Sequence, residues 1–133
     1  MIIQLYEDSM KEEVRSVVLD VLLEHGFEFD NRKDADLRDI KSYYFERGGT
    51  FFVGTESGRV IGTAGVRKLD ENICEIRRIY LKKNFRGEGN GKKLFTAALD
   101  FAEKNCTKVV LKTDSTLTKA IGMYLKHGFI FQK

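Results

Sequence analysis

The chain has 133 residues, of which 42% are hydrophobic and 32% charged, and its formal net charge is +3. That length suits one domain, 1–133, with a buried core, and no apolar run approaches the ~18 residues needed to cross a bilayer. So small a net charge does not by itself indicate a nucleic-acid-binding protein. The first residues, MIIQLYEDSM, lack the basic and apolar regions of a signal peptide, so we expect a cytoplasmic protein.

The first half of the chain predicts one strand and two helices. IIQLY, residues 2–6, has the composition of a short strand. Ser9 followed by Glu12 is a capping-box pattern, and apolar residues then recur at helical spacing until the glycine of His25-Gly26. A second helix is expected from Asp34 to Arg47, ended by two glycines.

The middle of the chain predicts an antiparallel meander. Residues 50–56 and 59–69 are rich in β-branched and aromatic residues, and Ser57-Gly58 between them is a hairpin turn. A second turn at 70–72 leads to ICEIRRIYL, residues 73–81.

The last part predicts helix, strand, helix and strand. One apolar helix face contains Leu94, Ala97, Ala98, Phe101 and Ala102. The strand KVVLKT, a helix over 116–126 and a final strand FIFQ follow. The order βααβββαβαβ predicts an α/β (α+β mixed sheet) fold with helices on the faces of the sheet.

Cysteine and histidine give no metal or disulfide pattern. Cys74 and Cys106 form no CxxC pair, so we expect reduced thiols. No ligand spacing recurs among these two residues and His25 and His127, so no metal site is expected.

The stretch FRGEGNGKKL, residues 85–94, is the strongest functional signal. It follows a strand, opens a helix and contains three glycines, which let a ligand approach the backbone closely. Free N–H groups and the positive end of the helix dipole make such a position an anion site. Seven basic residues against one acidic residue between Arg77 and Lys93 add positive charge.

Two common phosphate motifs do not fit this stretch. A P-loop needs a hydroxyl residue after Gly-Lys, and Lys93 stands there. A GxGxxG dinucleotide fingerprint beginning at Gly87 needs a third glycine where Lys92 stands.

The segment Arg86–Gly91, RGEGNG, resembles the R/Q-x-x-G-x-G/A pyrophosphate loop of the GNAT superfamily, the GCN5-related N-acetyltransferases. Downstream, Ala120–Phe129 resembles the A-x-x-x-Y-x-x-x-G-F segment of that family, and the element order is also similar. The resemblance implies a GNAT-type acyl-CoA N-acyltransferase fold with a shortened C-terminus.

The resemblance implies acetyl-CoA as cosubstrate, no metal, and direct transfer of the acetyl group to a primary amine of a small molecule or peptide. Pantetheine would lie along the strand end, and the pyrophosphate would bind the loop amides. The residues so implied are Ile79, Tyr80, Leu81, Arg86, Gly87, Glu88, Gly89, Asn90, Gly91 and Lys92.

Two residues are candidate catalysts. Tyr124 corresponds to the tyrosine that protonates the departing thiolate in similar enzymes, although a core aromatic is the alternative. Glu75 lies where histone-acetylating members carry a catalytic glutamate, and the alternatives are a solvated or cross-strand-paired residue.

Two other functions stay open at this point: a non-catalytic acyl-CoA sensor, and a nucleic-acid module that uses the basic run. Neither a nucleic acid nor a membrane is the expected partner. Six acidic against three basic residues in Glu24–Asp39 suggest a cationic amine as acceptor. Few residues follow Phe129, so the last strand would lack its usual neighbour, and a homodimer through that region is expected.

Overall fold

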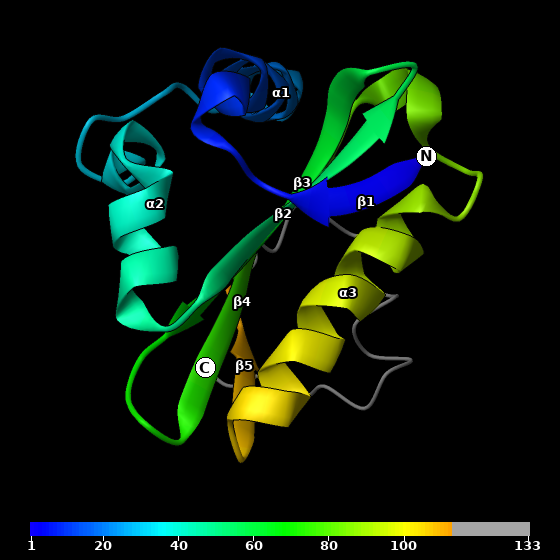
Figure 1. Ribbon diagram of the computed structural model, residues 1–133. Helices are drawn as coiled ribbons and strands as arrows, with labels where there is room; N and C mark the ends of the chain where they lie inside the picture. Colours follow the sequence, from blue (N-terminus) through cyan, green and yellow to red (C-terminus); the bar gives the residue numbers. More distant parts are fainter. Residues whose placement is uncertain (113–133) are drawn as a thin grey trace.

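The computed structural model describes residues 1–112, which form one mixed five-stranded sheet with helices on both faces (Figure 1). In spatial order, the strands are β1 (Ile2–Leu5), β2 (Thr50–Glu56), β3 (Arg59–Lys68), β4 (Ile73–Leu81) and β5 (Lys108–Leu111). The first four pair antiparallel, and β5 is parallel to β4. The predicted α/β class and the meander are therefore confirmed. The predictions for residues 116–132 lie outside the described residues.

The two predicted turns of the meander are present. Ser57 and Gly58 both have positive φ, as a tight hairpin turn needs, and they connect Glu56 to its partner Arg59. In the second turn, Asp70 Oδ1 accepts hydrogen bonds from the backbone N–H groups of Asn72 and Ile73, at 2.7 and 2.9 Å.

Helix α1 (Lys11–Glu24) is present, but the predicted capping box is wrong. A 3₁₀ turn, η1 (Asp8–Met10), precedes it, and the N-cap residue is Met10, with no side-chain capping bond. The end is as expected: His25 is the C-cap and Gly26 has a φ of +78°.

The predicted helix from Asp34 to Arg47 is wrong. The segment forms three short turns instead, η2 (Ala35–Arg38), α2 (Ile40–Tyr43) and η3 (Phe45–Arg47). Asp39 interrupts it with a φ of −147°, and its side chain accepts a hydrogen bond from Ser42 N. The segment also turns Asp36 inward, where its side chain is buried.

Two hydrophobic cores lie on opposite faces of the sheet. One packs sheet residues such as Val66 and Ile76 against helix α3 (Asn90–Asn105). The other packs Phe51 and Val53 of β2 against α1 and α2. The view in Figure 1 shows α3 on one side and α1 and α2 on the other. No helix within residues 1–112 is long and apolar enough to span a membrane.

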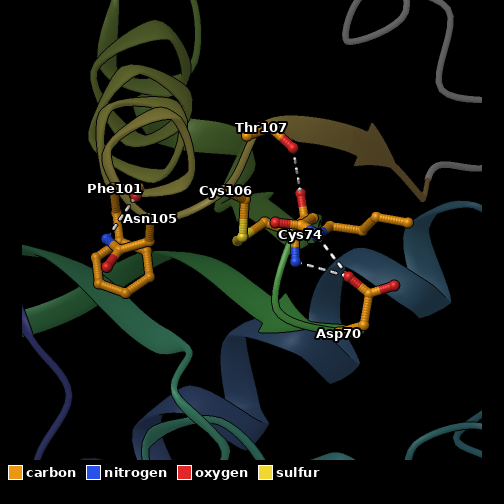
Figure 2. The surroundings of a disulfide bond; sticks show 8 residues. Asp70, Cys74, Phe101, Asn105, Cys106 and Thr107 are labelled. Atoms are coloured by element: carbon orange, nitrogen blue, oxygen red, sulfur yellow. Dashed lines mark hydrogen bonds between the residues drawn. A yellow bond between two sulfur atoms is a disulfide. The ribbon is translucent and has the colours of Figure 1, made fainter.

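Cys74 and Cys106 form a disulfide, so the expectation of two reduced thiols is wrong (Figure 2). Their Cα atoms are 5.9 Å apart, a usual separation for a disulfide. Cys74 is on β4, and Cys106 is the C-cap of α3. Next to it, Thr107 N donates to the backbone oxygen of Asn72 at 3.0 Å, which brings the end of α3 back to the sheet.

Candidate functional site

The glycine-rich loop connects the end of β4 to the start of α3. After Leu81 the chain makes a short 3₁₀ turn, η4 (Lys83–Phe85), and α3 begins at Asn90. Gly87 and Gly89 have φ angles of +84° and +82°, which residues with a side chain seldom adopt. The Asn90 side chain is buried and donates to Phe85 O at 3.1 Å, so it fixes the loop.

The backbone N–H groups from Gly87 to Lys92 make no hydrogen bond within residues 1–112. The N-cap Gly89 has no side chain that could satisfy them, and the first N–H to find a partner is that of Lys93, which donates to Gly89 O. A Cβ atom added at Gly87, Gly89 or Gly91 would meet no atom within 4 Å. The loop therefore presents unpaired donors to open space at a helix N-terminus, which is suited to an anion.

Arg86 connects this loop to two other elements. Its Nε and Nη2 atoms donate to Leu81 O at 2.9 and 2.7 Å. The same guanidinium forms an ion pair with Glu24 at the end of α1, where Nη2 lies 3.0 Å from Oε1. Hydrogen bonds from Arg86 lower the pKa of Glu24. Most of the donors of Arg86 are thus engaged within the protein.

Strand β4 contains an irregularity at Arg78, which has a φ of +59° although it is not glycine. Its register with β3 shifts between Thr63 and Gly65, and the hydroxyl of Thr63 donates to Arg78 O at 2.8 Å. The shift turns Arg77 and Arg78, neighbours in the chain, toward the face of the sheet that contacts Asp36. A β-bulge of this kind redirects side chains beside a functional site.

Arg78 is buried and anchors the segment that was predicted to be helical. Its Nε and Nη2 atoms donate to the two carboxylate oxygens of Asp36 at 3.0 and 2.6 Å, and Nη2 also contacts Asp34 at 2.8 Å. Tyr44 donates to Asp36 Oδ2 at 2.6 Å. Burial alone would raise the pKa of Asp36, but the bonds from Arg78 and Tyr44 lower it below its usual value. Burial, followed by the charge of Asp36, raises the pKa of the Tyr44 hydroxyl.

A cavity of about 620 Å³ lies beside this cluster. It is lined by the end of α1, the following loop, strand β4 and the residue after β5: Val21, Leu22, His25, Gly26, Phe27, Glu28, Asp30, Lys33, Asp34, Arg77, Arg78, Ile79, Tyr80 and Lys112. Its size is that of a small-molecule pocket. Two of the strand residues expected to contact pantetheine, Ile79 and Tyr80, line this cavity.

The structure brings most of the predicted binding residues together, but Glu75 lies elsewhere. The glycine loop and the residues Ile79–Leu81 are joined by Arg86, as described above. Glu75 does not line the cavity; its carboxylate pairs with Arg67 at 3.2 Å and with Arg77 at 3.4 Å. Tyr124 lies outside the described residues.

Sequence reasoning missed Arg77, Arg78 and Asp36 as parts of this site. The only signals were a basic run and an acidic segment, and neither indicates which charges pair. Within residues 1–112, no three residues of the metal-ligating types gather into a metal site.

Comparisons with known proteins identify the family of this chain. The acetyltransferase (GNAT) family matches residues 4–129, so the chain belongs to the GNAT family. A structure described as a GNAT-family acetyltransferase from Staphylococcus aureus Mu50 superimposes with a TM-score of 0.92 at 27% identity, covering 99% of this chain and 84% of the other.

Several named relatives are N-acetyltransferases. The chain is 29% identical to the uncharacterized N-acetyltransferase YjgM of Escherichia coli K12, over 87% of this chain and 74% of that protein. It is 35% identical to N-acetylaspartate synthetase of Xenopus tropicalis, over 71% of this chain and 36% of that protein. The chain is 34% identical to human N-acetyltransferase 8B, over 71% of this chain and 44% of that protein. The chain therefore spans less than half the length of the last two relatives.

Proposed function

We propose that this protein is an acetyl-CoA-dependent N-acetyltransferase that moves an acetyl group directly to a primary amine. The observation that carries the proposal is the run of N–H groups from Gly87 to Lys92 that have no hydrogen-bond partner within residues 1–112. These N–H groups lie at the start of α3, a helix of 16 residues. The chain that contains them belongs to a family of acetyltransferases.

The loop fits a pyrophosphate. Two phosphate groups need several donors and space for their oxygens, and added Cβ atoms at the three glycines would occupy that space. The ammonium groups of Lys92 and Lys93 have no ion-pair partner within residues 1–112, so they can add positive charge. Since Arg86 is bound to Leu81 O and Glu24, its main contribution is to hold the loop against β4.

The end of β4 suits the pantetheine arm. Strand β5 pairs with β4 only as far as Ile76 opposite Leu111, so Ile79–Leu81 lie beyond the paired part of β5. We propose that the amides of pantetheine lie along Ile79–Leu81. A backbone N–H near Leu81 would then donate to the thioester carbonyl oxygen as negative charge develops on it.

Acetyl-CoA supplies the activated acyl group as a thioester. In the proposed reaction, the amine nitrogen forms a C–N bond to the acetyl carbon, and the C–S bond breaks. The nitrogen loses its proton to a base, and the sulfur receives a proton from the Tyr124 hydroxyl. A base is useful because an alkyl ammonium, with a pKa of ~10.4, is almost fully protonated at neutral pH.

Glu75 remains the proposed base, acting through water. Its carboxylate is bound to Arg67 and Arg77 and does not line the cavity. A water molecule would have to carry the proton from the amine to Glu75. If it does not, water alone or another residue is the base.

A transfer assay tests the function: CoA thiol release from acetyl-CoA with a panel of primary amines, beside calorimetric titration with CoA. Amine-dependent thiol release with an N-acetylated product would support the proposal. CoA binding without transfer to any amine would leave an acyl-CoA sensor, and an absence of CoA binding would contradict the assignment of the loop.

A further inference from the structure

We propose that His25 accepts the proton of the attacking amine in the cavity between α1 and β4. The inference rests on the proposed N-acetyltransferase function, which names Glu75, acting through water, as the base and leaves that role open to another residue. It starts from the position of His25, which lines the same cavity as Ile79 and Tyr80, the strand residues proposed to contact pantetheine.

The ring nitrogens of His25 are unpaired and accessible. Neither makes a hydrogen bond within residues 1–112, and the ion-pair contact from Nε2 to Glu24 Oε2 is 3.8 Å, beyond hydrogen-bond length. In that part of the chain, the buried side-chain nitrogen and oxygen atoms without a partner are Arg67 Nε and Arg77 Nε. The nitrogens of His25 are therefore not buried, and its side chain is 27% exposed. A neutral ring can offer its lone pair to a group bound in the cavity.

The backbone holds His25 in place without using its ring. As the C-cap of α1, its N–H donates to Val21 O and Leu22 O, at 3.3 and 3.2 Å. Two residues later, Phe27 N donates to Leu22 O at 2.8 Å. A change of the His25 side chain keeps these bonds, so the role of the ring can be tested separately from the end of the helix.

The end of α1 stabilises the ring once it has taken up a proton. The carboxylate of Glu24 lies 3.8 Å from Nε2, and the C-terminal end of a helix is the negative end of its dipole. Arg86 binds the same carboxylate and offsets part of this effect. The other charged residues that line the cavity are three acids and four bases, so they nearly balance: Glu28, Asp30, Asp34, Lys33, Arg77, Arg78 and Lys112.

His25 suits this task better than the carboxylates nearby. Histidine is the side chain that ordinarily changes charge between about pH 5 and 8, and a carboxylate is ordinarily a weaker base. Asp34 and Asp30 are already hydrogen-bonded within the protein. Glu75 is bound to two arginines and does not line the cavity.

In the proposed step, the neutral ring takes a proton from the ammonium group of the acceptor. This gives an imidazolium and an amine with a free lone pair, whose nitrogen then forms the C–N bond to the acetyl carbon. As the C–S bond breaks, the nitrogen loses its second proton and the sulfur gains one, so these two protons balance. The imidazolium returns the first proton to solvent, and the whole reaction releases one proton.

The pH dependence of kcat/KM for an alkyl amine tests the inference. The N-acetylated product is measured, and the rates are expressed on the total amine concentration. With His25 as the base, kcat/KM should rise between about pH 5 and 8 and level off once the ring is neutral. Without a base on the protein, kcat/KM should follow the fraction of free amine. That fraction rises about tenfold per pH unit up to the amine pKa of ~10.4.

His25→Gln and Asp20→Asn form a matched pair of variants. Both remove a titratable side chain from the C-terminal part of α1, but Asp20 is exposed and does not line the cavity. His25→Gln should lower kcat/KM at neutral pH by about 100-fold or more, the range for losing a general base, and should abolish the levelling off. Asp20→Asn should leave both unchanged. Thermal unfolding and CoA titration show whether each variant keeps its fold and its CoA site.

The outcomes separate this inference from the proposed function. Acetyl transfer with the same pH profile in the wild type and in His25→Gln would overturn the inference and leave the function standing. A wild-type profile without a transition between about pH 5 and 8 would do the same, and it decides the question even if His25→Gln does not fold. Loss of this transition in Glu75→Gln but not in His25→Gln would assign the proton to Glu75. An absence of acetyl transfer to any amine would contradict the function itself, and this inference with it.

Discussion

Glu24 and Arg86 are 62 residues apart in the sequence and form a two-point ion pair that joins the end of α1 to the start of the glycine loop. The same guanidinium holds Leu81 O at the end of β4. One side chain thus fixes three elements around the proposed binding site.

We predict that Arg86→Ala destabilises the protein more than Glu24→Gln. The alanine variant loses the bonds to Leu81 O and to Glu24, at a cost of about 1–3 kcal/mol in the free energy of unfolding. Glu24→Gln loses only a partly exposed ion pair, about 1 kcal/mol or less. Urea unfolding measures both values. Equal losses would mean that the bond to Leu81 contributes little.

Gly91→Ala should separate stability from CoA binding. Gly91 is in the first turn of α3, without a positive φ, and an added Cβ meets no protein atom. Alanine should therefore stabilise the helix by up to about 1 kcal/mol. Its methyl group would occupy the proposed phosphate space, so CoA affinity should fall at least tenfold. Unchanged affinity in calorimetry would contradict the placement of the pyrophosphate.

Gly89→Ala is the comparison for that variant. Gly89 has a φ of +82°, so alanine there is strained by about 1 kcal/mol or more even without ligand. The two variants should thus change stability in opposite directions while both weaken CoA binding.

Stability at acidic pH should depend on Asp36. The pKa of Asp36 is lower in the folded protein than in the unfolded chain, since the bonds from Arg78 and Tyr44 outweigh burial. The contribution of Asp36 to the free energy of unfolding is therefore complete above its pKa in the unfolded chain, ~3.9. It is lost as the pH falls through the lower pKa of the folded protein. Denaturant unfolding between pH 2 and 7 measures this pH dependence of the free energy of unfolding.

Asp36→Asn should remove that part of the pH dependence. At neutral pH it should also destabilise the protein by about 3–5 kcal/mol, as expected when a buried ion pair loses one partner. A loss below about 1 kcal/mol would show that Asp34 alone satisfies Arg78.

Tyr124→Phe should lower kcat by about 10- to 1,000-fold with little change in CoA affinity, the range for losing a general acid. Single-substrate titrations and steady-state kinetics separate the two quantities. An unaltered turnover number would assign Tyr124 to packing.

Glu75→Gln should change the acid limb of the pH–rate profile if Glu75 accepts the proton from the amine. The structure adds a control, because Arg67→Gln removes one ion-pair partner of Glu75 and keeps the carboxylate. A profile of Glu75→Gln that superimposes on the wild type would leave water or another residue as the base.

The sequence predicted what depends on local pattern. The meander, its two turns and the helix after the glycine loop follow from strand composition, Gly58 and Asp70, and the apolar stripe of α3. The glycine loop between β4 and α3 was likewise visible, because its three glycines lie within five consecutive residues, 87–91.

The errors concern partners that are distant in the sequence. Asp36 contributes to an apparent helix in 34–47, yet its carboxylate is bound by Arg78, 42 residues away. Cys74 and Cys106 form no recognisable sequence motif. Cys74 lies on β4 and Cys106 lies between α3 and β5, and the parallel pairing of β5 with β4 brings the two sulfurs together. The positive φ of Arg78 has no signal in its residue type.

The Cys74–Cys106 bond closes a covalent ring that contains nearly all of β4, the glycine loop and all of α3. Tying residues 32 positions apart contributes about 3–4 kcal/mol by restricting the unfolded chain, on the loop-entropy estimate. A protease that cuts once inside the ring, for example after Lys92, would therefore release no fragment. The nicked chain should migrate as one species on a denaturing gel without reductant and as two species once the disulfide is reduced.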